Sequence, residues 1–558
     1  MQKPHDDMIN VSNHLRNMAQ SQPYKRAVVC PTVKDADGLI AYAHLTFQQL
    51  DQESDRIAHG FETLGITRGT RTLLMVKPSI DFFAITFAFF KVGAIPVVVD
   101  PGMGIGRMLS CLKQSRPRAM IGIPPAHVLR IFQRKYFKTL KTWITVGRRL
   151  FWGGPTLRQI KTTSLKPFSI AKTGRDETAA ILFTTGSTGP AKGAIYTHGI
   201  FDAQIRHIKS HFHITPDEID LPTFPLFALF DPALGMTAVI PDMDPTKPAL
   251  VNPEKIIEAI HNHGVTNMFA SPALLDRVGR YGVEKEIKLN SIKRVVSAGA
   301  PVSPENIERF QNLLNPDAEI HTPYGATEAV PVISIASREI LTQTKKLTQQ
   351  GYGMCVGRPL DGINVQIIKI TDRPIPQWSD DLVEFDGEVG EITIQGDLVT
   401  KAYFENSEAD ALSKISANST ANEPIWHRMG DLGWKDPKGR IWYCGRKNHR
   451  VITTRGTLFS IPCEAIFNNH PSVFRSALVG VGEPPDQKPV ICIELEQSQG
   501  RHPKADIKKE LLNIAQNHEL TQEIETVLFH RSFPVDIRHN SKIFREKLRL
   551  WAQKQLKH

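Results

Sequence analysis

The stretch best suited to chemistry is a polar, glycine-rich segment at residues 184–193. Apolar runs at 179–183 and 194–196 flank it, and each predicts a buried strand. Glycines let the backbone approach a ligand closely, while hydroxyls and the ammonium group of Lys192 supply donors and positive charge. A polyphosphate needs this combination, so the segment predicts a phosphate-binding loop. Its other candidate contacts are Thr184, Thr185, Gly186, Ser187, Thr188 and Gly189.

Two common phosphate-binding motifs do not fit this chain. A P-loop needs Ser or Thr directly after its lysine, whereas Gly193 follows Lys192 and no helix start comes after it. A second glycine cluster, Gly102-Met103-Gly104-Ile105-Gly106, follows an apolar run, but its spacing is not that of a dinucleotide-binding loop. A plain turn is the better interpretation of that cluster.

The loop resembles the signature of the adenylate-forming superfamily, which includes acyl-CoA synthetases, luciferases and peptide-synthetase adenylation domains. That signature reads Thr-Ser-Gly-Ser/Thr-Thr-Gly-x-Pro-Lys-Gly. Here Thr185 replaces the serine, which keeps the hydroxyl, and Pro190-Ala191 replaces x-Pro. Downstream, Tyr324-Gly325-Ala326-Thr327-Glu328 matches the superfamily's Tyr-Gly-x-Thr-Glu without change. The resemblance implies ATP as substrate and Mg²⁺ as cofactor.

The resemblance also implies a role for each matched residue. Tyr324, after which Gly325 makes the turn, would stack on the adenine, and Thr327 would contact the α-phosphate. Glu328, with Thr184, would hold Mg²⁺, for which a carboxylate is a suitable hard ligand. The small residues that end an apolar strand would form a wall against the adenine, and these are Gly299, Ala300 and Pro301.

Three matches near the carboxyl end are weaker. His427-Arg428-Met429-Gly430-Asp431 keeps only the Gly-Asp of the family's Tyr-x-Thr-Gly-Asp, so Asp431 is the expected ribose ligand and Arg446 an added contact. Asn448 stands at the family's hinge, which is usually Asp or Lys. Lys542 follows Ser541 where the family has Gly-Lys. It would stabilise the transition state, so the expected catalytic residues are Lys542, Lys192 and Glu328.

The elements around these motifs predict an α/β fold. Strands and helices alternate from residue 71 to residue 123, as in a parallel sheet, and a β-rich section follows at 357–445. Strands are also expected at 267–270 and 319–324, helices at 253–263 and 542–555, and a helix cap at Thr46. We expect a large adenylation domain at 1–445, built of αβ-layered subdomains and this β-rich section. A small, mobile α+β lid at 446–558 would carry the catalytic lysine.

Composition limits the possible partners. The 558 residues carry a net charge of +11, and no run of like charges supports nucleic-acid binding. The most apolar stretch, 82–99, is interrupted by Lys91, Gly93 and Pro96, so it predicts a buried helix and strand, not a membrane span. An amphipathic terminal helix allows weak contact with a membrane surface at most. Six scattered cysteines indicate free thiols and a cytoplasmic location.

Within the superfamily, three segments look like the olefin-pathway β-lactone synthetases, which are often labelled fatty acid–CoA ligases. They lie at 99–104, 221–248 and 536–546, and Ala228 stands where fatty acyl-CoA synthetases usually have histidine. The implied substrate is a long-chain 2-alkyl-3-hydroxy fatty acid, whose 3-hydroxyl attacks the adenylated carbonyl. The implied partners are other olefin-pathway enzymes.

Two alternatives remain at this point. A long-chain acyl-CoA or acyl-carrier ligase would need CoA or a carrier for its product. A degenerate ATP-binding scaffold is disfavoured because Lys192, Glu328, Asp431 and Lys542 are all present. The expected walls of the acyl pocket are the segments 224–236 and 325–331.

Overall fold

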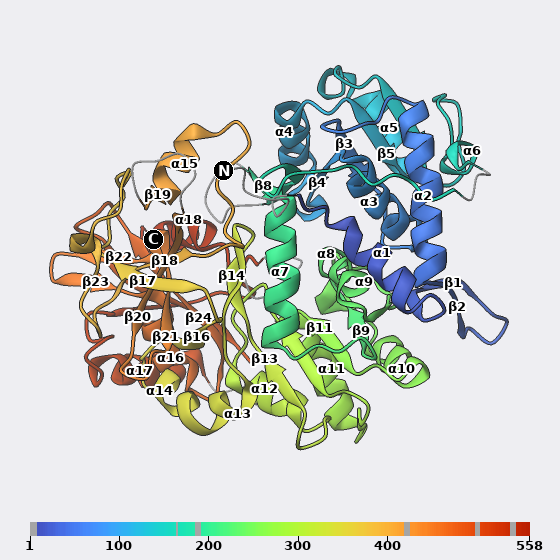
Figure 1. Cartoon of the computed structure of the whole chain (residues 1–558). Coiled ribbons are helices and arrows are strands. Elements are labelled where there is room, and N and C mark those ends of the chain that lie inside the picture. Colours follow the sequence, from blue (N-terminus) through green and yellow to red (C-terminus); the bar gives the residue numbers. More distant parts are fainter. Residues whose placement is uncertain are drawn as a thin grey trace.

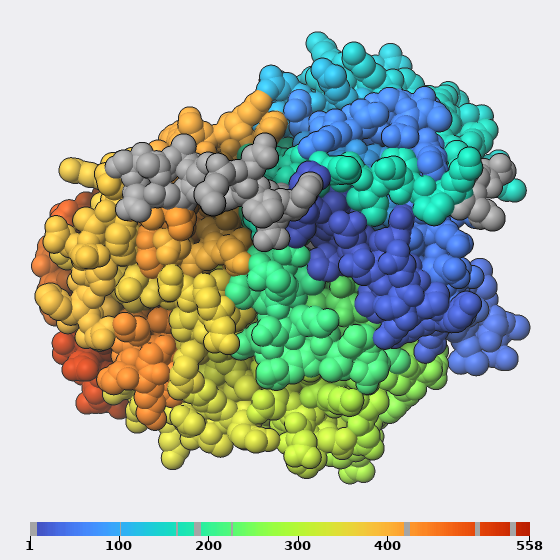
Figure 2. Space-filling view, viewed as in Figure 1, coloured from blue at the N-terminus to red at the C-terminus, as the bar shows by residue number. Residues whose placement is uncertain are grey.

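The computed structural model describes residues 8–162, 166–184, 191–417, 424–496, 503–535 and 543–557. Two α/β layers and a β-rich section make up most of the chain (Figure 1). Helix α7 (His198–His211) runs between the α/β part and the β-rich part in that view. In the space-filling view, most of residues 8–162 lie on one side and 443–557 on the other (Figure 2).

The first layer is a six-stranded sheet in the order β6-β5-β3-β4-β7-β8. All neighbouring pairs are parallel except β7 and β8, which form an antiparallel hairpin. Its strands are β3 (Arg71–Met75), β4 (Ile95–Val99), β5 (Ala119–Gly122), β6 (Thr142–Thr145), β7 (Thr178–Thr184) and β8 (Lys192–Thr197). The predicted strands on both sides of the glycine-rich loop are therefore confirmed.

The order of this sheet places its helices on two faces. Helix α3 (Ile80–Val92) connects β3 to β4, and helix α4 (Ile105–Ser115) leads from β4 back past β3 to β5. The two connections run in opposite directions across the sheet, so right-handed crossovers put α3 and α4 on opposite faces. Helix α5 (Pro124–Phe132) continues in the direction of α4 and shares its face.

The second layer is a seven-stranded sheet in the order β13-β12-β11-β9-β10-β1-β2, parallel apart from the β1·β2 hairpin. Its strands are β1 (Arg26–Lys34), β2 (Ile40–Thr46), β9 (Ile219–Pro222), β10 (Thr237–Val239), β11 (Asn267–Ala270), β12 (Arg294–Ser297) and β13 (Glu319–His321). The helices around it include α1 (Ser12–Ser21), α2 (Phe47–Thr63), α10 (Pro253–His263), α11 (Pro272–Glu284) and α12 (Pro304–Gln311). Thr46 caps α2 in a capping box, as its position in the sequence predicts.

The β-rich section is an antiparallel sheet ordered β14-β15-β16-β21-β20-β18-β17, with β19 beside β20. Its strands are β14 (Tyr324–Ala326), β15 (Ala329–Ser334), β16 (Met354–Pro359), β17 (Asn364–Ile368), β18 (Gly390–Gln395), β19 (Lys414–Ser416), β20 (Ile425–Lys435) and β21 (Ile441–Arg446). The sequence predicted one strand at 319–324, which is wrong. Thr322 and Pro323 separate β13 from β14, and the two strands belong to different sheets.

The last residues form two small sheets of their own. A hairpin joins β22 (Val451–Thr453) and β23 (Gly456–Leu458), and β24-β25-β26 form a three-stranded sheet. The remaining elements are β24 (Val473–Val481), β25 (Lys488–Leu495), β26 (Thr526–Phe529), α16 (Ser460–Asn468), α17 (Lys504–Gln516) and α18 (Arg545–Gln555). The terminal helix begins at Arg545, not at the predicted residue 542.

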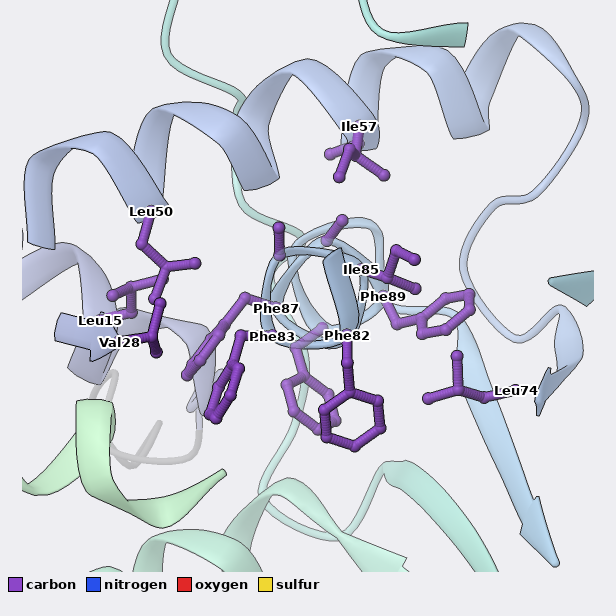
Figure 3. Packing of buried hydrophobic residues seen from close by; sticks show 14 of the residues in the cluster. Leu15, Val28, Leu50, Ile57, Leu74, Phe82, Phe83, Ile85, Phe87 and Phe89 are labelled. Atoms are coloured by element: carbon purple, nitrogen blue, oxygen red, sulfur yellow. The ribbon is translucent and has the colours of Figure 1, made fainter. Parts of the chain in front are cut away.

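Helix α3 is apolar on every side because it is buried on every side. Ser79 caps its first turn and Gly93, at φ 71°, ends it. Lys91 is fully buried, and its Nζ lies 2.6 Å from a carboxylate oxygen of both Asp51 and Asp55 on α2. Viewed along α3, Ile57 of α2 lies on one side while Phe82, Phe83 and Phe87 point to the other (Figure 3).

All six cysteines are buried free thiols, as expected. Among the described residues, we find no helix long and apolar enough to cross a membrane.

Candidate active site

The phosphate-loop candidates lie partly outside the described residues. These are Thr185, Gly186, Ser187, Thr188 and Gly189, and the same holds for Lys542. The described ends of the loop are close together, since Thr184 pairs with Lys192 across the β7·β8 hairpin. Phe183 and Lys192 both line the same large cavity, so the loop begins and ends at its wall.

A tight hairpin presents the hydroxyl and carboxylate of the Tyr-Gly-x-Thr-Glu motif. Ala326 of β14 pairs with Ala329 of β15, which leaves Thr327 and Glu328 at the tip, and both line the cavity. A Cβ at Gly325 would lie 2.6 Å from the Ala329 carbonyl oxygen, so only glycine fits there. The hydroxyl of Tyr196, a buried residue of β8, donates to the Thr327 carbonyl and ties the tip to the first sheet.

A tyrosine that the motifs did not identify holds the Glu328 carboxylate. The buried Tyr403 hydroxyl donates to Glu328 Oε1 at 2.5 Å, and the Thr400 backbone N–H donates to the Glu328 carbonyl at 2.8 Å. Burial, together with the Glu328 charge, raises the pKa of Tyr403, so its phenol keeps the proton that it donates. The carboxylate at the cavity is therefore fixed by a neutral donor.

Two lysines lie against the ring of Tyr403. The Lys192 Nζ is 5.0 Å from the ring centroid and the Lys414 Nζ is 5.5 Å from it. Lys414 is buried and donates to the Thr400 carbonyl. Burial lowers the pKa of Lys414 to about 8, and the Glu328 carboxylate opposes that shift. Nothing in the sequence around Lys414 signals this position.

The predicted ribose residue contacts two other predicted site residues. Asp431 pairs with Arg446 across β20 and β21, and the Arg446 Nε lies 3.1 Å from Asp431 Oδ1. The Tyr324 hydroxyl donates to Asp431 Oδ2 at 2.7 Å, although the two residues are 107 positions apart. The Asp431 carboxylate raises the pKa of Arg446, so the guanidinium stays charged. Arg446 itself lines the cavity.

Part of the small-residue segment that follows β12 lines the cavity. Ala298 and Gly299 line it, and Gly299 has a φ of 97°, a conformation that favours glycine. Ala300 and Pro301 follow directly in the chain. His427 also lines the cavity, and burial with the nearby Lys414 charge holds its pKa well below the usual range. It is therefore a neutral imidazole at physiological pH.

The cavity that joins these residues has a volume of about 1690 Å³. This exceeds the roughly 300–1000 Å³ of common small-ligand sites. Lys192, Glu328, Tyr403 and Arg446 lie on its polar wall, and most other lining side chains are apolar. The wall includes residues from both predicted acyl-pocket segments, 224–236 and 325–331. It also includes aromatic side chains of α3 and α7, which the motifs did not suggest.

His207, His211 and His213 have a spacing in the sequence that resembles a metal site, but His207 of α7 has another partner in the structure. His207 Nε2 lies 2.8 Å from Asp397 Oδ1 on the surface. Over the described residues, no group of three or more His, Cys, Asp or Glu side chains is arranged to hold a metal ion.

Comparison with known proteins gives one family and a consistent fold. A family model described as "AMP-binding enzyme" matches residues 15–404. The olefin β-lactone synthetase of Xanthomonas campestris is 45% identical over 98% of both chains, and that of Stenotrophomonas maltophilia is 45% identical over the same shares. The amide bond synthetase McbA of Marinactinospora thermotolerans has a TM-score of 0.78 at 20% identity, covering 97% of this chain and 99% of its own.

Proposed function

The chain belongs to the family of AMP-binding enzymes, and we propose that it activates a long-chain 2-alkyl-3-hydroxy acid with ATP and closes it to a β-lactone. The observation that carries this proposal is the 45% identity to an olefin β-lactone synthetase over 98% of both chains. The large cavity, most of whose lining side chains are apolar, supports an acid with long alkyl groups. Ala228, buried in α8 (Pro225–Ala228), agrees with this branch of the superfamily.

The residues at the polar wall fit ATP and Mg²⁺. A magnesium ion is commonly held by one or two carboxylates together with substrate phosphates, and Glu328 supplies one such carboxylate. When bound, the ion would offset phosphate charge. Lys192 supplies a second positive charge on the same wall, and Thr184 is the second proposed protein ligand. The carboxylate of Asp431, oriented by Tyr324 and Arg446, is the proposed ribose acceptor.

The proposed chemistry has two steps. A carboxylate oxygen of the acid attacks the α-phosphorus of ATP, and pyrophosphate leaves. The 3-hydroxyl oxygen then attacks the acyl carbon, AMP leaves with the electron pair of the broken bond, and the hydroxyl proton passes to water. CoA is not needed, because an intramolecular nucleophile already has a high effective concentration. Buried aromatic and aliphatic side chains in the apolar part of the lining limit the water that can reach and hydrolyse the adenylate.

Residues 446–558 are proposed to act as a lid that carries the catalytic Lys542. Contacts at the beginning of this segment support a hinge there. Lys447 Nζ lies 3.2 Å from the buried Glu391 carboxylate, and Arg450 Nη2 lies 2.8 Å from Asp372. Asn448 lies between these two anchored residues and lines the cavity. Rigid-body closure about such a short segment is a common way to exchange catalytic groups between steps.

The six buried thiols favour a reducing compartment, and we infer the cytoplasm. Because the proposed product is a β-lactone, we propose that the next enzyme in the reaction sequence consumes β-lactones. The four-membered ring is strained, so rapid transfer to a decarboxylating enzyme would protect it from hydrolysis.

Product mass spectrometry tests the proposed function. The full chain is incubated with MgATP and a synthetic 2-alkyl-3-hydroxy acid, with and without CoA. We expect a product that has lost one water from the acid, with AMP formed and no need for CoA. Lys542→Ala serves as the control for enzymatic turnover and should form neither the lactone nor AMP at a detectable rate.

Two results would contradict the proposal. A CoA thioester that appears only with CoA would indicate an acyl-CoA ligase instead. AMP release from neither mixture would mean that the substrate class is wrong.

A further inference from the structure

The apolar part of the cavity has two arms on opposite faces of the six-stranded sheet. We infer that each arm binds one of the two alkyl chains of a branched 2-alkyl-3-hydroxy acid, an inference that rests on the proposed function. The inner arm is lined by Val98, Leu182, Phe87, Phe90, Phe201 and Ile205. The outer arm is lined by Met75, Val99, Ile105, Met108, Ala126 and Leu129.

The inner arm lies between the sheet and helices α3 and α7. Val98 of β4 and Leu182 of β7 face it from the strands, and the aromatic side chains come from the two helices. In Figure 3, Phe82 and Phe87 point to the side of α3 away from α2, and both line the cavity. Phe87 and Ile205 are 2% and 3% exposed, so these side chains of the inner arm are shielded from solvent.

The outer arm lies on the other face, against α4 and α5. Side chains alternate along a strand, so Val97 and Val99 point away from the face that carries Val98. Val97 and Val99 pack with Met108 and Leu129 in one apolar cluster, whereas Phe87 and Ile205 belong to another. Ile105, at the start of α4, is 62% exposed, so the outer arm opens to solvent.

The two arms join beyond the carboxyl ends of β4 and β7. The sheet backbone separates them along the strands, because β4 and β7 are neighbours in one hydrogen-bonded ladder. Phe183 and Asp100, at or just past the ends of these strands, line the cavity, as does Lys192 at the start of β8. The polar wall with Glu328 is part of the same cavity, so an acid group there has an apolar arm on each side of the sheet.

This geometry matches an acid with two chains on adjacent carbons. With the carboxylate at the polar wall, the chain on carbon 2 and the chain on carbon 3 must leave in different directions. A straight-chain acid would fill one arm and leave the other empty. Each buried methylene is worth about fourfold in binding, so chains in separate arms should contribute independently.

The test uses two variants that shorten one arm each. Ile205→Phe narrows the inner arm and Met108→Phe narrows the outer arm, while Val128→Phe adds the same ring to an exposed position of α5 as a control. Three acids are compared: short on both carbons, long only on carbon 2, and long only on carbon 3. Pyrophosphate release gives kcat/KM, and mass spectrometry identifies the lactone.

We expect each variant to discriminate against one long-chain acid only. The ring adds about one methylene of volume relative to Ile or Met, which should lower kcat/KM for that acid by roughly fourfold, with changes below about 1.5-fold for the other acid. Ile205→Phe and Met108→Phe should each impair a different long-chain acid, and Val128→Phe should impair neither. If both narrowing variants impair the same acid, or impair both equally, the inference is overturned.

Two further comparisons keep the result interpretable. Ile205→Ala and Met108→Ala enlarge the same arms and should shift the preferred chain length upward on opposite carbons, so a narrowing variant that fails to fold does not decide the outcome. Wild-type protein with the doubly short acid tests the proposed function separately. Lactone from wild type with no arm-specific effect would overturn the two-arm inference alone, whereas the absence of lactone with all three acids would overturn both.

Discussion

Removing the Tyr403 hydroxyl is the sharpest test of how the site holds its proposed metal ligand. The hydroxyl of the buried Tyr403 donates to Oε1 of the half-buried Glu328 at 2.5 Å, and both residues line the cavity. A hydrogen bond to a charged group contributes about 1.5–3 kcal/mol. Residues that orient a metal ligand typically change metal affinity by about 10–100-fold when they are lost. Tyr403→Phe keeps the ring that both lysines contact and removes only this donor.

We therefore expect Tyr403→Phe to raise the free Mg²⁺ concentration for half-maximal rate by about 10–100-fold. Pyrophosphate release is measured against free Mg²⁺ at saturating ATP and acid. The KM for the acid should change by less than about threefold, because the hydroxyl points to Glu328 and not to the apolar arms. The free energy of unfolding should fall by about 1 kcal/mol, since water from the cavity can replace the lost donor.

The chain offers a matched control for this variant. The Tyr281 hydroxyl donates to Glu254 Oε1 at 2.8 Å on the surface, and neither residue lines the cavity. Tyr281→Phe removes the same kind of bond and should leave the Mg²⁺ dependence unchanged. The reasoning would be refuted if Tyr403→Phe showed the Mg²⁺ dependence of wild type, or if it lost rate equally at every Mg²⁺ concentration.

Three further predictions concern charge. Burial lowers the pKa of Lys414 from 10.5 to about 8, so between these pH values the unfolded chain binds more protons and the free energy of unfolding rises with pH. Relative to Lys414→Met, the free energy of unfolding of wild type, measured in urea, should increase by up to about 3 kcal/mol between pH 8 and pH 10.5. The same pH dependence in both proteins would contradict the effect of burial. Asp431→Asn removes the ion pair with Arg446 and should raise the KM for ATP about 10–100-fold in steady-state titrations. Lys542→Ala should lower the rate of pyrophosphate release at least about 100-fold with an unchanged melting temperature, and a normal rate would exclude it from the transition state.

The structure confirms the predicted helices and strands where apolar runs and helix-capping residues indicate the same boundaries. The predicted helix at 253–263 and strand at 267–270 coincide with α10 and β11. Ser79, Thr46 and Gly93 mark helix ends because their side-chain or backbone properties act within one turn. The predicted strand at 319–324 was wrong because Pro323 interrupts it, and periodicity alone does not reveal that β14 joins another sheet.

The site residues likewise divide into those that a local motif predicts and those that only the tertiary structure identifies. Thr327 and Glu328 follow from a contiguous motif in which each residue lies within a few positions of the next. Tyr403 and Lys414 come from segments with no such pattern. Tyr403 is placed by a bridge to Ala194 of β8. Lys414 lies on β19, which pairs with β20 in the sheet that also contains the hairpin of β14 and β15. No short-range sequence pattern predicts these contacts.

The amino-acid sequence alone determined the local chemistry of this protein: a strand, a polar glycine-rich loop and a second strand, followed by a glycine turn that carries a hydroxyl and a carboxylate. These features depend on contacts between neighbours in the chain. Only the tertiary structure decided that Tyr324 contacts Asp431, that Tyr403 holds Glu328 and that the apolar cavity has two arms. The reason is physical: strand order and helix crossovers bring residues from distant parts of the chain together, and hydrophobic periodicity specifies which face of a strand or helix is buried but not which element covers it.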